Sequence, residues 1–136
     1  MLELVAASTI IGIGMIPALK LTTKGVTHAN DLELSETLLS LCASKMEEEM
    51  ARTMAGWDLN DHQGQFSIAA HPELRFQVSK SDSSVDGGLP GKLAAIQVVV
   101  WQDTDADAIV DSSEHNVWLA TKLAKLTSYE EKSKSN

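Results

Sequence analysis

Hydrophobic residues follow three successive patterns along the chain. Residues 4–19 read LVAASTIIGIGMIPAL and carry no charge. Residues 31–56 repeat apolar residues at every fourth position among charged ones, which predicts an amphipathic helix. Between residues 65 and 124, apolar and polar residues alternate in short runs typical of strands. The order predicts an α+β protein: a long N-terminal helix, apolar in its first part, followed by a small antiparallel sheet of three or four strands.

The same patterns divide the chain into an apolar helix (1–20), a head (21–126) and a polar tail (127–136). Residues 20–30 contain Gly25 and lose the apolar period, which indicates a weakened helix or a short connection. Asn30 and Glu33 have the spacing of a capping box, so a helix is expected to restart there. Gly56 and the polar residues after it are expected to end that helix.

The amphipathic helix is expected to face the core with a stripe rich in methionine and leucine, whereas Glu48 and Glu49 are expected to face elsewhere. The stripe comprises Leu34, Leu38, Cys42, Met46, Met50 and Met54, with Leu39 and Ala43 beside it. Cys42 is the only cysteine, so an intramolecular disulfide is excluded, and we interpret it as a small buried apolar side chain. Strands are predicted over residues 65–69, 74–79, 93–102 and 116–124.

Charge and motifs exclude several function classes. The net charge is −8, and all the excess negative charge lies after residue 30, where the chain has 18 acidic and 9 basic residues. Such a surface repels phosphate backbones, which argues against nucleic-acid binding. The chain has no Gly-rich phosphate loop, no nucleophile elbow and no zinc-protease motif, and its four histidines are scattered over predicted loops. An enzyme is therefore not expected.

Glu3 is the informative residue of the apolar segment. The 16 uncharged residues after it are marginal against the roughly 20 that span a bilayer, and no signal-peptidase site follows them. A carboxylate at the edge of hydrocarbon costs a few kcal/mol unless it is neutralised or paired. Glu3 therefore either lies in the headgroup layer without a role or requires a cationic partner.

The start of the chain, Met1-Leu2-Glu3-Leu4-Val5-Ala6-Ala7-Ser8, resembles the mature N-terminus of type IV pilins and pseudopilins. Two later stretches also resemble the family: Ala43 to Glu48, and the pair Val100-Trp101 followed by residues 119–124. Because the head is short and has no cysteine pair, the chain is most similar to a minor pseudopilin of the I type of type II secretion systems.

The resemblance implies a structural subunit of a type II secretion pseudopilus or type IV pilus-like filament. Leu2, Glu3 and Leu4 would be its assembly residues, and Glu3 would pair with the N-terminal amine of a neighbouring subunit. Its partners would be other pilin-like subunits and the prepilin peptidase, and its location the bacterial inner membrane with the head in the periplasm. The alternative is a signal-anchored periplasmic head that binds calcium or a protein and never polymerises.

The resemblance also implies residues ahead of Met1. The family's basic leader, cleavage-site glycine and phenylalanine would all lie upstream of this methionine. Lys20 and Lys24 alone would hold the C-terminal side of the apolar segment in the cytoplasm, and a basic leader would reverse that bias. We therefore expect Met1 to be an internal methionine.

An acidic loop lies between the last two predicted strands. Its acids fall at positions 1, 3, 5, 9 and 12 of a twelve-residue stretch, which is the ligand order of an EF-hand-type calcium loop. They are Asp103, Asp105, Asp107, Asp111 and Glu114. Ala108 stands where such loops need glycine, and the flanks are predicted strands instead of helices. The loop is therefore either a Ca²⁺ site or a solvated acidic turn, and no other cofactor is expected.

Overall fold

A computed structural model describes the backbone of residues 2–126 and the side chains of Lys20 and residues 24–126. The chain divides into two units after Glu36, and each is described by itself. The side chains of the predicted assembly residues Leu2, Glu3 and Leu4 lie outside the described residues, as does the predicted polar tail 127–136.

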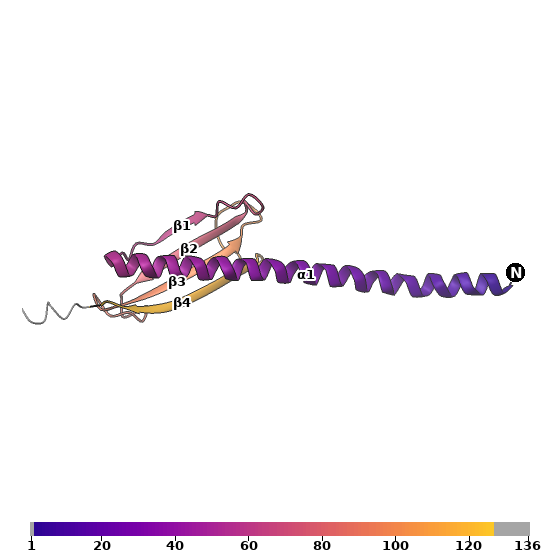
Figure 1. Ribbon diagram of the computed structural model, residues 1–136, viewed down its shortest axis with the longest axis horizontal. Helices are drawn as coiled ribbons and strands as arrows, with labels where there is room; N and C mark the ends of the chain where they lie inside the picture. Colours follow the sequence, from indigo (N-terminus) through magenta and orange to yellow (C-terminus); the bar gives the residue numbers. More distant parts are fainter. Residues whose placement is uncertain (1, 127–136) are drawn as a thin grey trace, which may run out of the picture. The chain divides into compact units, whose positions relative to one another are not determined.

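Helix α1 runs over Leu2–Gly56 (Figure 1). It continues through residues 20–30, so the predicted short connection and the new helix start at Asn30 are wrong. This stretch has no proline, and one glycine costs a helix only about 1 kcal/mol. Thr27 also donates a hydrogen bond from its hydroxyl to the Lys24 carbonyl oxygen at 2.9 Å, as helical residues do. Among the residues described with side chains, no helix is long and apolar enough to cross a membrane.

Four strands form one antiparallel sheet, as predicted, and their order across the sheet is β1-β2-β3-β4. They are β1 (His62–Gln65), β2 (Leu74–Ser81), β3 (Leu93–Gln102) and β4 (Asn116–Ala124). The bounds predicted for the last two strands are confirmed, and β2 extends two residues beyond its prediction. The strand predicted over residues 65–69 is wrong, because β1 begins at His62 and residues 66–69 pass into a turn closed by the bond from the His71 N–H to the Ile68 carbonyl.

Packing against a neighbouring aromatic ring explains why position 64 in β1 is a glycine. A Cβ atom at this position would lie 2.8 Å from the Cζ of Phe76, its partner across the strands. The Phe76 ring therefore lies directly against the glycine backbone, and any side chain would have to displace it.

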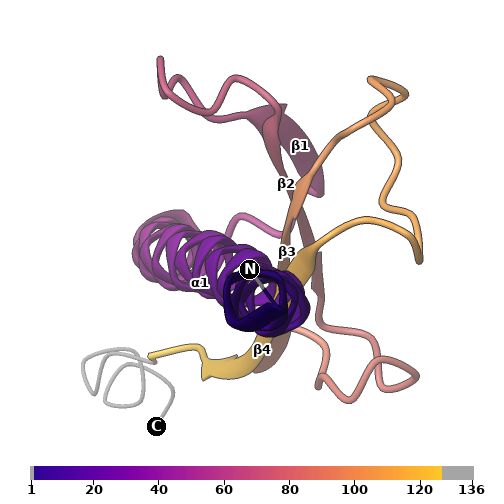
Figure 2. The same cartoon turned by 90° about the vertical axis from the view of Figure 1, so that its right-hand side faces the viewer.

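The second half of α1 packs on one face of the sheet (Figure 2). Leu38, Cys42 and Met46 of the helix are buried, together with alternate residues of β2 and β3. Cys42 is fully buried, as predicted, and its thiol lies 3.5 Å from the Val98 carbonyl oxygen. Burial raises the pKa of this thiol.

The buried face of α1 departs from the predicted stripe after Met46. Met50 is only half-buried and Met54 is 55% exposed, whereas Glu49 and Thr53 are fully buried. A four-residue step exceeds the 3.6-residue turn, so each repeat drifts by about 40° around the helix. After Met46, the helix residues that face the core are therefore Glu49 and Thr53. The expectation that Glu49 faces away from the core is wrong.

Candidate functional site

The acidic loop (residues 103–114) connects β3 to β4, and the structure brings three of its five predicted ligands together. Asp103, Asp105 and Glu114 each place one carboxylate oxygen so that all three lie within 4.8 Å of one another. Asp103 directly follows the last residue of β3, and Glu114 lies two residues before β4. The ends of the two paired strands therefore hold the first and last acids of the loop close together.

The other two predicted ligands, Asp107 and Asp111, are not part of this group of three. Asp107 accepts a hydrogen bond on its Oδ1 from the Ile109 N–H at 2.7 Å. Asp111 donates its backbone N–H to Glu114 Oε2 at 3.3 Å. Both residues shape the loop, but the full five-residue set predicted from spacing is not assembled.

The loop makes its sharp turn with alanine in place of glycine. Ala106 has φ of 62° and Ala108 has φ of 64°, so both adopt the left-handed conformation. That conformation costs a residue with a Cβ roughly 1–2 kcal/mol. Ala108 donates its N–H to Asp103 Oδ2 at 3.3 Å, which ties the turn to the first acid. The alanine at position 6 is therefore compatible with the turn that the calcium-loop spacing requires.

Negative charge accumulates around Asp105. The hydrogen bond from the Asp107 N–H lowers the pKa of Asp105, but desolvation and the charges of Asp107, Glu114 and Asp103 outweigh it and the pKa is raised. Arg75 of β2 supplies a compensating positive charge, because its Nε pairs with Asp103 Oδ2. Glu114 is buried and accepts a hydrogen bond from the Thr104 N–H at 2.8 Å. The loop thus concentrates hard oxygen ligands that repel one another.

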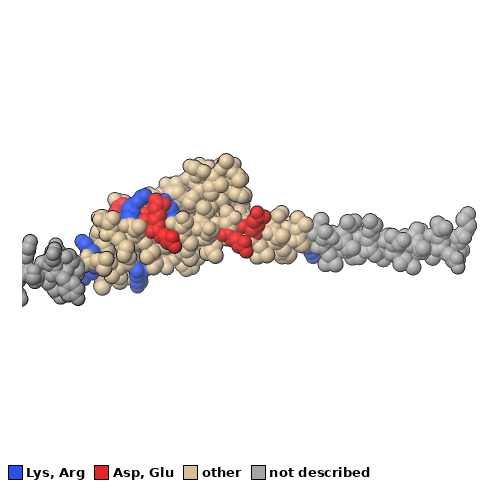
Figure 3. Space-filling model, viewed as in Figure 1, with Lys and Arg blue, Asp and Glu red and all other residues tan. Residues whose placement is uncertain are grey.

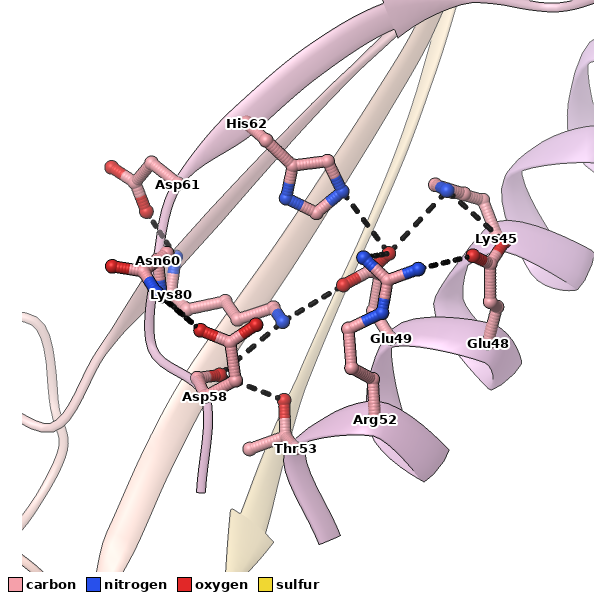
Figure 4. A network of polar contacts seen from close by, with 10 residues as sticks. All are labelled: Lys45, Glu48, Glu49, Arg52, Thr53, Asp58, Asn60, Asp61, His62 and Lys80. Carbon is pink, nitrogen blue, oxygen red and sulfur yellow. Dashed lines mark hydrogen bonds and ion pairs between the residues drawn. The ribbon is translucent and has the colours of Figure 1, made fainter. Parts of the chain in front are cut away.

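A second group of charged residues, the ion-pair cluster, surrounds Glu49 in the core (Figure 4). Glu49 Oε2 lies 2.8 Å from Lys80 Nζ, and both side chains are fully buried. Its other oxygen, Oε1, lies 3.1 Å from His62 Nε2, 3.4 Å from Lys45 Nζ and 3.7 Å from Arg52 Nη1. One buried carboxylate therefore joins α1 to β1 and β2.

The ion-pair cluster also ties down the segment that leaves the helix. Lys80 donates from Nζ to the Asp58 carbonyl oxygen at 3.3 Å, and Thr53 donates its hydroxyl to the same oxygen at 3.2 Å. The Lys80 N–H bonds to Asp61 Oδ1 at 2.7 Å. Acidic and basic side chains also meet on the surface beside this part of α1 (Figure 3), where Arg52 pairs with Glu48 at 2.8 Å. The cluster therefore connects α1, the segment that follows it, β1 and β2 through charged contacts.

Stability should fall in acid because of Glu49. Burial alone would raise the pKa of Glu49, but the hydrogen bond and charge of Lys80, then the charges of His62 and Arg52, lower it overall. A carboxyl whose pKa is lowered by folding stabilises the protein above the ordinary glutamate range, and this stabilisation is lost as the pH falls through the lowered value. Lys45 also faces this carboxylate from α1.

We therefore expect urea unfolding midpoints to decrease between about pH 5 and about pH 2, and the decrease to be smaller in Glu49→Gln. Glu47→Gln, an exposed neighbour on α1, is the matched control and should keep the wild-type slope. An equally steep decrease in Glu49→Gln would show that Glu49 does not contribute to the acid sensitivity.

Comparison of the chain with models of known families, with curated proteins and with solved structures found no match.

Proposed function

We propose that this protein is a structural subunit of a type II secretion pseudopilus or type IV pilus-like filament, most like a minor pseudopilin, and that it supports protein secretion. The proposal rests mainly on the composition of helix α1. Its first residues contain an uncharged run opened by Glu3, and its residues 37–56 supply the core helix of an antiparallel α+β head. One element thus combines an assembly segment with the scaffold of the head.

Glu3 supplies the chemistry of assembly in this proposal. A carboxylate carried into an apolar helix bundle is costly unless a cation meets it. The N-terminal amine of a neighbouring subunit is such a cation, and the pair cancels two charges that would each be unfavourable alone. Leu2 and Leu4, the apolar neighbours of Glu3 in the sequence, complete the assembly residues of the proposal.

The proposal also predicts where in the cell the protein is located. Before assembly, the apolar run holds the chain in the bacterial inner membrane, and the head lies in the periplasm. A prepilin peptidase then processes the N-terminus, and the partners of the mature chain are other pilin-like subunits. The net negative charge of the head is consistent with an exposed position on a filament, because repulsion between like charges opposes non-specific association of the heads.

A second candidate function is a signal-anchored periplasmic head that binds calcium or a partner protein without polymerising. The convergence of Asp103, Asp105 and Glu114 favours it, because a cation site needs no filament.

The chemical state of the mature N-terminus distinguishes the two functions. We expect mass spectrometry of the protein purified from its native membrane to find a methylated N-terminal amine on a residue ahead of Glu3. Blocking the prepilin peptidase should abolish this species and leave a longer, unmethylated form. A chain that keeps a basic leader in cells with active peptidase would instead support the anchored head.

A further inference from the structure

We propose that the acidic loop is a Ca²⁺ site in which Asp103, Asp105 and Glu114 are the carboxylate ligands and Asp107 is not. The inference goes beyond the filament function and does not depend on it. Its four supports are the spacing of the three carboxylates, a buried carboxylate oxygen without a partner, the charge balance and the chemistry of the ligands.

The spacing of the three carboxylates suits a single ion. Oxygens that bind one Ca²⁺ at about 2.3–2.6 Å lie at most roughly 5 Å from one another. One oxygen from each of Asp103, Asp105 and Glu114 already lies within 4.8 Å of the others. The loop therefore brings the ligands into range without a change of fold.

Asp103 carries the observation that points most directly to a ligand. Its side chain is only 2% exposed, and its Oδ1 is buried without a hydrogen-bond partner. The other oxygen, Oδ2, is already held by Arg75 and by the N–H of Ala108. An unpaired buried carboxylate oxygen is strongly unfavourable, and a bound cation would satisfy it. Because Oδ2 has two partners, Oδ1 is the oxygen of this carboxylate that lacks one.

The charges around the group match a divalent ion. The three carboxylates carry three negative charges, and the Arg75 guanidinium offsets one of them. Two negative charges are left on this group of three, and the exposed carboxylate of Asp107 in the same loop adds to the negative charge around it. A divalent cation would balance this charge and draw the carboxylates together.

The ligand chemistry selects Ca²⁺ among divalent ions. All three side-chain ligands are hard oxygens, which suit Ca²⁺ and Mg²⁺ better than the softer metals bound by histidine and cysteine. Mg²⁺ demands a near-ideal octahedron at short distances, whereas Ca²⁺ accepts six to eight oxygens in irregular loops. Backbone carbonyls and water would complete the shell. With only three carboxylates we expect affinity in the range of extracellular modules, with Kd of roughly 10⁻⁴–10⁻³ M.

Calorimetric titration of the full chain in mild detergent with CaCl₂, and separately with MgCl₂, tests the site. We compare the wild type with Asp105→Asn and with its matched control Asp107→Asn. Both aspartates are exposed, so neither substitution disturbs the core. We expect Asp105→Asn to weaken calcium binding at least tenfold, about the effect of losing one charged ligand. Asp107→Asn should stay within about threefold of the wild type, and Mg²⁺ should bind more weakly than Ca²⁺.

Thermal unfolding provides a second readout that shows whether the variants are folded. Without calcium, Asp105→Asn should melt at or above the wild-type temperature, because the substitution removes repulsion inside the loop. With calcium at about 10 mM, the wild type and Asp107→Asn should gain clearly more stability than Asp105→Asn. The proposal is overturned if the wild type binds no Ca²⁺ up to about 10 mM, if the two variants bind equally, or if Mg²⁺ binds as tightly as Ca²⁺. Assembly plays no part in these measurements, so they do not test the filament function.

Discussion

Replacing Lys80 with methionine is expected to lower the free energy of unfolding by about 3 kcal/mol. The Lys80 ammonium lies 2.8 Å from Glu49 Oε2, and neither side chain is exposed to water. Without Lys80, this oxygen would remain charged in the core without its nearest partner. The effect should fall at the lower end of the range for broken buried pairs, because His62 and Lys45 still face the other carboxylate oxygen.

Two further variants identify the cause of this loss. Arg52→Met is the matched control, since Arg52 lies 3.7 Å from Glu49 but is 47% exposed, and it should cost less than about 1 kcal/mol. The double variant Glu49→Met with Lys80→Met should recover most of the stability, because an apolar pair leaves no uncompensated charge. Urea denaturation followed by circular dichroism measures all three. Equal losses for Lys80→Met and Arg52→Met would contradict a specific role for the buried pair.

The sequence predicts the sheet best where apolar alternation is long. The run LAAIQVVVWQ gives β3 its bounds, and NVWLATKLA gives β4 its bounds, because each run matches a strand with one face on the helix. By contrast, β1 consists of His62, Gln63, Gly64 and Gln65, which have no apolar pattern. This strand forms through its pairing with β2, a contact between distant residues that local propensity does not contain.

The ion-pair cluster was missed, although two sequence signals point to it. Glu49 lies eleven residues after Leu38, which is close to three helical turns and therefore on the same face. Lys80 follows Leu74, Phe76 and Val78 at every second position, so it shares their inward face of β2. Charged residues at inward positions on two elements that pack together indicate a buried pair, and only the packing shows that the two meet.

In the acidic loop, the spacing of the acidic residues predicts only part of the arrangement of their side chains. The calcium-loop spacing selects the segment in which Asp103, Asp105 and Glu114 converge. Asp107 and Asp111 do not join them, because Asp107 is engaged with the Ile109 N–H and Asp111 supports Glu114 through its backbone. Strands on both sides of the loop impose a path different from that between two helices, and ligand order cannot reveal this difference.

The recovery of Glu3→Ala in sheared filaments tests whether Glu3 is an assembly residue. Cells with a complete pseudopilus or pilus system would express the wild type, Glu3→Ala or the control Glu36→Ala, which removes a glutamate from the same helix. We expect the wild type and Glu36→Ala to reach filaments equally. The amount of Glu3→Ala in filaments should fall at least tenfold, and the variant should stay in the membrane. The substitution leaves the N-terminal amine of the neighbouring subunit without a partner, and an unpaired charge in an apolar environment costs about 2.5–3.5 kcal/mol. Recovery of Glu3→Ala in filaments at the wild-type level would show that filament assembly does not require Glu3.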